Sequence, residues 1–106
     1  GRMAKTKNRK RAEALRERDG DLCWLCGKPV DFEAAPNSAT AWSVEHLLAT
    51  KHHGPDDLEN LVLCHPPCNG KLRDLSLRDK IALREDRLRE QWLEKLVSKA
   101  RLALAA

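Results

Sequence analysis

Aromatic side chains are scarce in this sequence, although hydrophobic residues make up 42% of it. Its 106 residues include no tyrosine, one phenylalanine, one methionine and three tryptophans, so aromatic residues make up 4% of the chain. Charged residues make up 34%. A chain of this length forms one domain, and a domain with so little material for an apolar core is expected to need a metal ion or disulfides. We therefore expect a single domain over residues 1–106 that is stabilised by a metal ion or by disulfides.

Long apolar runs are also lacking. No stretch approaches the roughly 20 apolar residues that a membrane-spanning helix needs. The Lys/Arg-rich N-terminus is not followed by the apolar segment of a signal peptide. These absences predict a cytoplasmic protein with no membrane partner. In a reducing compartment, thiolates bound to zinc are expected rather than disulfides.

The charges are distributed unevenly along the chain. Residues 1–20 contain 8 Lys and Arg against 3 Asp and Glu, residues 21–70 contain 2 against 7, and residues 71–106 contain 10 against 6. An acidic centre is therefore flanked by two basic arms. Basic arms favour a polyanion such as DNA, and a carboxylate-rich centre suits a cation site. Two solvated helix surfaces explain the arms equally well.

Four cysteines form two close pairs, Cys23-x-x-Cys26 and Cys64-x-x-x-Cys68, with 37 residues between the pairs. Tetrahedral Zn²⁺ takes four thiolates at about 2.3 Å, and close pairs let each segment supply two of them. The doubled pair favours a structural zinc site of four cysteines over four free thiols. His65 lies inside the wider second pair and could replace one cysteine as a ligand.

Alternation of apolar and polar residues predicts a hairpin in the middle of the chain. One strand is expected over residues 41–48 and its partner over 58–63, joined by a long connection. A basic helix within residues 5–20 precedes the hairpin, and a short helix begins near Asn69 after it. The predicted fold class is α+β, with a zinc-stabilised core over residues 21–74.

Residues 75–106 predict one long amphipathic helix. Ser76-x-x-Asp79 resembles a capping box, and the residue types up to about Leu102 favour a helix. The apolar stripe along this helix consists of Leu77, Ile81, Leu88, Trp92 and Leu96. Such a helix spans roughly 40 Å. We expect part of the stripe to pack on the core and the remainder to project or to pair with a second copy of the chain.

Several further residues, most of them with polar side chains, lie between the cysteine pairs and directly after them. They are Glu45-His46, Gly54, Asn60-Leu61 and, directly after the last cysteine, Asn69-Gly70-Lys71. With the cysteine pairs, this pattern closely resembles the HNH endonuclease family over Cys23 to Lys71, about half of the chain. A short protein of this kind is similar to the HNH proteins of bacteria and their phages.

The resemblance implies a ββα-metal fold, in which a hairpin and a helix surround one catalytic divalent cation. His46 would be the general base, Glu45 and Asn69 would bind Mg²⁺ or Mn²⁺, and Asn60 would hold the loop and orient His46 by hydrogen bonds. The products would carry a 5′-phosphate and a 3′-hydroxyl. Histidine is the side chain whose ordinary pKa suits a base near neutral pH, and hard oxygen ligands suit these cations.

The motif departs from the family pattern in three places. Glu45 stands where aspartate is commoner, Ala49 where proline is usual, and His53-Gly54 replaces a common Gly-Gly. Neighbouring residues of a strand also point to opposite faces, so Glu45 and His46 would not both face one cation in a regular strand. Either the hairpin twists or bulges there, or one ligand approaches from its side.

The remaining polar residues near the motif are expected to have smaller roles. Asp56 and Asp57 are expected to be solvated turn residues, and His52 an exposed loop residue. The candidate contacts to DNA phosphates are Lys51, His53, Lys71 and Arg73.

The sequence therefore predicts a DNA endonuclease with structural zinc and a catalytic divalent cation. The alternatives are a zinc module that binds nucleic acid or protein without cutting DNA, and a subunit of a phage packaging complex or another DNA-processing complex. A dimer through the C-terminal helix is a further expectation.

Overall fold

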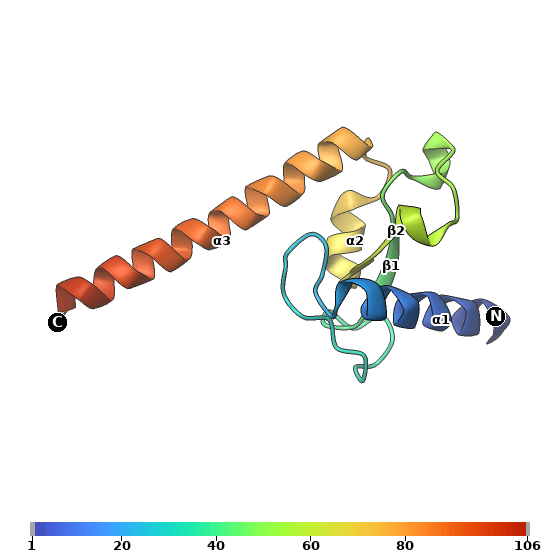
Figure 1. Cartoon of the computed structure of the whole chain (residues 1–106), viewed down its shortest axis with the longest axis horizontal. Helices are drawn as coiled ribbons and strands as arrows, with labels where there is room; N and C mark the ends of the chain where they lie inside the picture. The colour runs from blue at the N-terminus through green and yellow to red at the C-terminus, as the bar shows by residue number, and fades with distance from the viewer. Residues whose placement is uncertain (1, 106) are drawn as a thin grey trace.

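The computed structural model of the chain describes residues 2–105, with side chains from Lys7 onward. Its elements in chain order are α1 (Arg2–Asp19), β1 (Ser43–His46), the 3₁₀ turns η1 (Thr50–His52) and η2 (Leu58–Asn60), β2 (Leu61–Cys64), α2 (Pro66–Leu72) and α3 (Leu77–Ala105). Figure 1 shows α1, the hairpin and α2 gathered together, with α3 extending away from them. The predicted α+β class is confirmed.

The centre of the fold is a short antiparallel hairpin. β1 and β2 pair residue by residue, from Ser43 opposite Cys64 to His46 opposite Leu61, and all four residues of β2 are buried. The first strand is shorter than predicted because the ladder ends after Leu47, whose N–H donates to the carbonyl of Asn60. The next backbone groups of the chain bond to the Asn60 side chain instead.

Helix α1 packs against the hairpin through two apolar residues. Ala12 and Leu15 are fully buried, and they belong to one core cluster with residues of β2 and α2. The segment between α1 and β1 contains two isolated bridges and no longer strand among the described residues. Within it, Gly27 takes a φ of +74°, which permits the tight turn after Cys26.

Helix α2 begins earlier than predicted. Pro66 occupies its first turn, where the missing N–H and the fixed φ of proline favour a helix start. Cys68 and Leu72 are the buried residues of this short helix. Asn69 therefore lies inside α2, directly after a buried cysteine.

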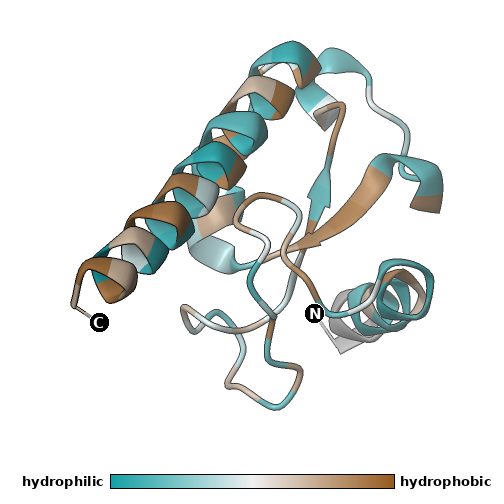
Figure 2. Cartoon of the chain, turned by 60° about the vertical axis from the view of Figure 1, so that its left-hand side comes forward, coloured by the Kyte–Doolittle hydropathy of each residue, from teal (hydrophilic) through white to brown (hydrophobic). Residues whose placement is uncertain are grey.

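The Ser76 cap predicted for the long helix is present. The Asp79 N–H donates to the Ser76 hydroxyl at 3.1 Å, and α3 then continues for 29 residues. Lys80 is the only buried residue of this helix in the described part of the chain. The Leu/Trp stripe lies outside the core of the single chain, with Trp92 61% exposed. Figure 2 shows hydrophobic residues alternating with hydrophilic ones along α3.

Two polar contacts tie the middle of α3 to the segment around the first cysteine pair. Arg84 donates to the carbonyl of Trp24, and Gln91 donates to the carbonyl of Cys26. Beyond these contacts the helix projects, and the described chain measures 56 × 31 × 22 Å. None of the helices within residues 2–105 combines the length and the apolar composition needed to cross a bilayer.

Candidate active site and metal centre

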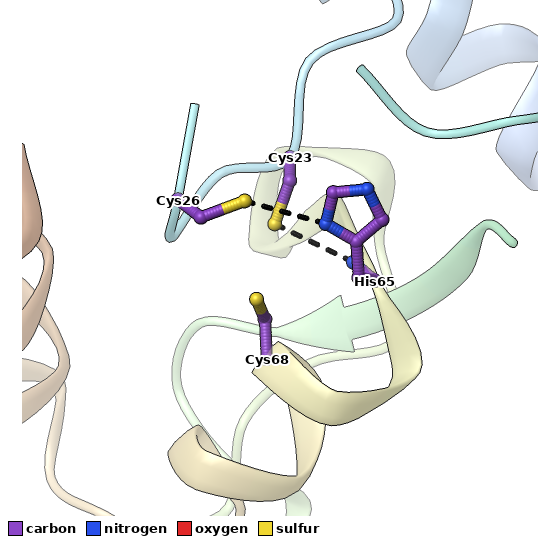
Figure 3. A group of neighbouring side chains, drawn as sticks. All are labelled: Cys23, Cys26, His65 and Cys68. Carbon is purple, nitrogen blue, oxygen red and sulfur yellow. Dashed lines mark hydrogen bonds between the residues drawn. The ribbon is translucent and has the colours of Figure 1, made fainter. Parts of the chain in front are cut away.

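Three of the four cysteines and one histidine gather in one buried cluster. One potential ligand atom from each of Cys23, Cys26, His65 and Cys68 lies within 4.8 Å of the others, and all four residues are buried (Figure 3). Sulfurs bound to one tetrahedral zinc at about 2.3 Å lie roughly 3.8 Å apart. The cluster therefore fits a zinc site with three sulfur ligands and one nitrogen ligand.

The hydrogen bonds of His65 select the nitrogen that faces this cluster. Its Nε2 lies 2.8 Å from the carbonyl oxygen of Pro29, an acceptor only, so Nε2 carries the proton. Nδ1 then holds the lone pair, and it lies 3.3 Å from Cys26 Sγ. A carbonyl partner on the far nitrogen is the usual arrangement of a metal-bound histidine.

Cys64 lies outside this cluster, which therefore differs from the predicted four cysteines by one residue. It is fully buried at the end of β2 and hydrogen-bonded to Cys23. That bond lowers the pKa of Cys23 to about 4, and the same bond together with burial raises the pKa of Cys64. The Cys64 thiol is therefore a neighbour of the Cys23 sulfur at the edge of the cluster.

The spacing of the second pair carried a signal for His65. His65-x-x-Cys68 has the same two-residue separation as Cys23-x-x-Cys26, whereas Cys64 and Cys68 are one residue further apart. In each of the pairs Cys23/Cys26 and His65/Cys68, two residues then separate the two ligands. The possibility that His65 replaces a cysteine is the one that fits this geometry.

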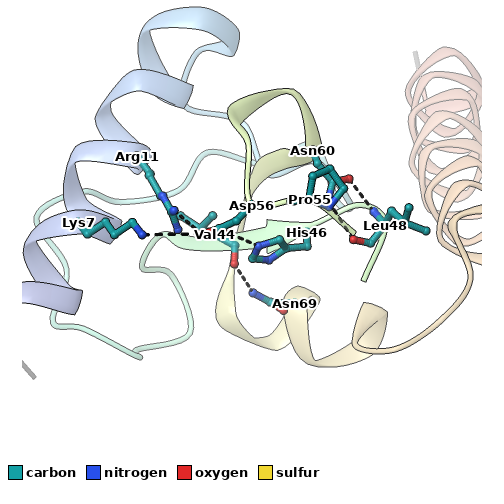
Figure 4. Close-up of polar contacts among 9 residues, drawn as sticks. All are labelled: Lys7, Arg11, Val44, His46, Leu48, Pro55, Asp56, Asn60 and Asn69. Atoms are coloured by element: carbon teal, nitrogen blue, oxygen red, sulfur yellow. Dashed lines mark hydrogen bonds and ion pairs between the residues drawn. The ribbon is translucent and has the colours of Figure 1, made fainter. Parts of the chain in front are cut away.

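The second group of polar residues surrounds His46, the last residue of β1. Its Nε2 lies 2.9 Å from Oδ1 of Asp56, and its side chain is 25% exposed (Figure 4). Asp56 also pairs with Arg11 and, at 3.8 Å, with Lys7 of α1. Hydrogen bonds from Arg11 and His46 lower the pKa of Asp56 to about 2. Asp56 is 51% exposed, as expected of a solvated loop residue, and its contacts with Arg11 and His46 add to that expectation.

Asn60 fastens the loop that carries Asp56. Its side chain accepts from the N–H of Leu48 at 2.8 Å and donates to the carbonyls of Leu48 and Pro55, each at 2.9 Å. Among the described residues, the hydrogen bond to His46 comes from Asp56 and not from Asn60. Asn60 therefore acts on the loop backbone, and Asp56 is the residue that contacts the imidazole.

Glu45 points into the core beside a buried lysine. Lys80 Nζ lies 3.4 Å from Glu45 Oε1 and 2.6 Å from the carbonyl oxygen of His46. Burial raises the pKa of Glu45, against the opposing effect of Lys80. No bulge interrupts the four pairs of the hairpin, so Glu45 and His46 occupy opposite faces of β1 as a regular strand requires.

Asn69 reaches β1 from α2. Its Nδ2 donates to the Val44 carbonyl at 3.2 Å and to the Ser43 hydroxyl at 3.3 Å, which leaves Oδ1 without a hydrogen bond among the described residues. Glu45 Oε2 is likewise buried with no hydrogen-bond partner there. Carboxylate and amide oxygens with unused acceptor capacity suit a hard divalent cation. Each residue alone has the donor chemistry of a cation ligand, whereas Glu45 lies on the face of β1 opposite His46 and is paired with Lys80.

The four candidate DNA contacts lie on the surface. Lys51, His53, Lys71 and Arg73 are all exposed. His52 Nε2 lies 2.9 Å from the Asp74 carbonyl, so the loop that carries two of them touches the turn after α2, next to the other two. The four exposed side chains therefore come from two segments that contact each other.

Sequence reasoning gave no role to Arg11 or to Lys80. Lys80 lies one helical turn before Leu83, which packs against the core, and this face of α3 meets the hairpin in place of the Leu/Trp stripe. A lysine four residues after the cap of an amphipathic helix carries no local sign that it will be buried. The partner of Arg11 lies 45 residues away in the chain.

Comparison with protein families agrees with the site. A model described as HNH endonuclease matches residues 23–74, which contain both ligand pairs, His46 and Asn69. Comparisons with curated proteins and with solved structures give no match. By the domain at residues 23–74, the chain belongs to the HNH endonuclease family.

Proposed function

We propose that the protein is a metal-dependent DNA endonuclease in which His46 is the general base. HNH domains are generally nucleases that bind DNA. The observation that carries the proposal is the position of His46. Its imidazole stands at the end of β1, partly exposed and held by a carboxylate at 2.9 Å, on a strand that also carries Glu45 and meets Asn69.

In the proposed reaction, His46 takes a proton from water while the water oxygen forms a bond to phosphorus. The bond from phosphorus to the 3′-oxygen breaks, and that oxygen takes up a proton to become a hydroxyl. The other product keeps a 5′-phosphate. Glu45 Oε2 and Asn69 Oδ1 would hold the divalent cation. When bound, the cation supplies a Lewis acid that neutralises charge on the phosphoryl and leaving oxygens.

A zinc ion at the Cys/His cluster would fix the position of Asn69 relative to His46. Two of its ligands come from the turn at Cys23 and Cys26, and the others from the start of α2. Asn69 directly follows the ligand Cys68 and contacts β1. Fixing the start of α2 therefore fixes Asn69 against the strand that carries His46.

We also propose that the flanking helices belong to the same domain as residues 23–74. Arg18 of α1 donates to the carbonyls of Leu58 and Leu61, and Lys80 of α3 is buried against Glu45. The positive charge of the two flanking regions would supply sequence-independent attraction to DNA, which weakens steeply with salt.

Incubation of supercoiled plasmid with the zinc-loaded protein tests this function. We expect no cleavage in the presence of EDTA and cleavage on addition of Mg²⁺ or Mn²⁺, with product ends that DNA ligase can rejoin because they carry a 5′-phosphate. Zinc content is measured in each sample, since a chelator that removes zinc would also unfold the protein. Plasmid that stays intact with every cation would contradict the proposal.

One observation favours the second candidate, a zinc module that binds DNA without cutting it. Glu45 is already paired with the ammonium group of Lys80, so a divalent cation at Glu45 has to share that carboxylate with a fixed positive charge. Binding of labelled DNA with no cleavage at any cation concentration would support this candidate. Cleavage that begins only when a DNA-processing complex is added would support the partner-dependent subunit.

A further inference from the structure

Helix α1 lies outside the segment that matches the HNH family, yet it contacts the loop beside His46 at two places. Arg11 pairs with Asp56 at one end of the segment 56–61. Arg18 donates to the carbonyls of Leu58 at 2.8 Å and Leu61 at 2.9 Å at the other end. The loop residue that touches His46 is therefore fixed by a helix from another part of the chain.

The contact between Arg11 and Asp56 is shielded from solvent on the arginine side only, since the Asp56 side chain is 51% exposed. The Arg11 side chain is 19% exposed, against 65% for Lys7, the other cation of α1 near the same carboxylate. Asp56 has one oxygen on Arg11 and the other on His46 Nε2. Both oxygens of the carboxylate therefore have a hydrogen-bond partner.

This arrangement determines which nitrogen of His46 is free. An ionised carboxylate only accepts hydrogen bonds, so Nε2 must carry the proton. The lone pair of the neutral imidazole then lies on Nδ1, the nitrogen that would receive a proton from water. Without Asp56, the ring can change tautomer and rotate.

We propose that Arg11 and Asp56 are positioning residues for His46, which hold its imidazole in the tautomer with the lone pair on Nδ1. The proposal rests on the proposed function of His46 as the general base. It assigns α1 a part in the active site, in addition to any attraction of its basic residues to DNA. Neither residue reacts with the substrate.

Nitrogen NMR of the zinc-loaded protein tests the tautomer without any cleavage assay. At about pH 8, where an ordinary imidazole is neutral, long-range ¹H–¹⁵N correlations distinguish the protonated nitrogen from the bare one, and His46→Ala assigns the signals. We expect a single tautomer protonated on Nε2 in the wild type, and exchange between tautomers in Asp56→Ala. A proton on Nδ1, or an unchanged spectrum in Asp56→Ala, would overturn the proposal.

Kinetics on a DNA duplex provide the second test. We expect Asp56→Ala to lower kcat by about 10- to 100-fold with a smaller change in KM, as for other residues that orient a reacting group. Arg11→Met is expected to lose about 10-fold, and Arg11→Lys to recover most of this because an ion pair to Asp56 can form again. Thermal melting and zinc content confirm that each variant is folded.

Lys10→Met is the matched control for the charge of α1. Lys10 is exposed on the same helix, and none of the contacts of the described residues joins it to Asp56. We expect its effect in KM rather than in kcat. If Lys10→Met and Arg11→Met raise KM equally and leave kcat unchanged, Arg11 acts only by attracting DNA through its charge. That result would overturn its positioning role.

The two proposals fail in different ways. If the wild type cuts no DNA but Asp56 still fixes the tautomer, the proposed function fails and the positioning role stands. If the wild type cuts DNA, His46→Ala does not, and Asp56→Ala cuts as fast as the wild type, the positioning role fails and the proposed function stands.

Discussion

Replacement of His65 by alanine is expected to abolish zinc binding and, with it, the cooperative unfolding transition of the protein. His65 is one of four clustered ligands, and its Nδ1 faces the cluster because Nε2 is bonded to Pro29. Structural zinc contributes about 10–16 kcal/mol of apparent binding free energy, which is comparable to the whole stability of a small domain. A chain with so few aromatic residues in its core has little to replace it.

Cys64→Ser is the matched control for this experiment. Cys64 neighbours His65 in sequence and is also buried, but it lies outside the cluster, beside Cys23. A serine hydroxyl is close in size to the thiol and can still hydrogen-bond to the Cys23 sulfur. We expect Cys64→Ser to keep about one zinc per chain and a cooperative melt, measured by metal analysis and circular dichroism.

The opposite result would identify the four cysteines as the zinc ligands. If Cys64→Ser loses zinc and His65→Ala retains it, the four cysteines are the ligands and His65 is a neighbour. The distinction matters for the fold because His65 immediately precedes α2, whereas Cys64 ends β2. A ligand at position 65 fixes the start of the helix that carries Asn69.

Removal of the Lys80 ammonium group is expected to be the most destabilising change outside the metal centre. The side chain of Lys80 is fully buried, and that of Glu45 is 7% exposed. Lys80→Met leaves the Glu45 carboxylate buried without a counter-ion and removes the donor to the His46 carbonyl. Breaking a buried pair in this way costs about 3–5 kcal/mol. Chemical denaturation of the zinc-loaded protein measures the loss.

The destabilisation of Lys80→Met should depend on pH. Burial already raises the pKa of Glu45 in the folded chain, and loss of Lys80 raises it further. A carboxyl group whose pKa is higher in the folded state is tolerated while protonated and destabilises the fold as pH rises through that pKa. The stability difference from the wild type is therefore expected to be larger at pH 7 than near pH 5.

Two further variants isolate the charge from the packing. Adding Glu45→Gln to Lys80→Met removes the unpaired charge and is expected to restore part of the lost stability. Arg78→Met, at an exposed position of the same helix, is expected to change stability by less than about 0.5 kcal/mol. A loss for Lys80→Met that is independent of pH and unaffected by Glu45→Gln would show that the pair matters through packing alone.

Features set by local chemistry could be predicted from the sequence. The cap at Ser76 and the close pair at Cys23 and Cys26 depend on residues a few positions apart, the strands of the hairpin depend on their own alternation, and the structure contains all three. The family resemblance is confirmed by the match over residues 23–74. The roles proposed for His46, Glu45, Asn60 and Asn69 remain predictions.

Features set by tertiary contacts could not be predicted in the same way. The contacts of Asp56 with Arg11 and His46 were not predicted, because nothing in its own segment shows that these residues will approach it. The burial of Lys80 depends on the angle at which α3 leaves α2, which a helical pattern does not specify. The Leu/Trp stripe was expected partly in the core, yet Leu88, Trp92 and Leu96 are exposed in the single chain.

Single-turnover cleavage of a labelled DNA duplex by His46→Ala tests the role of His46 most directly. The variant and the wild type are compared with equal zinc content and saturating Mn²⁺, with His52→Ala as an exposed-histidine control. Loss of a general base predicts a rate about 10²- to 10⁴-fold lower than that of the wild type, with DNA binding retained. A zinc-loaded His46→Ala that cuts within a fewfold of the wild-type rate would contradict the proposed mechanism.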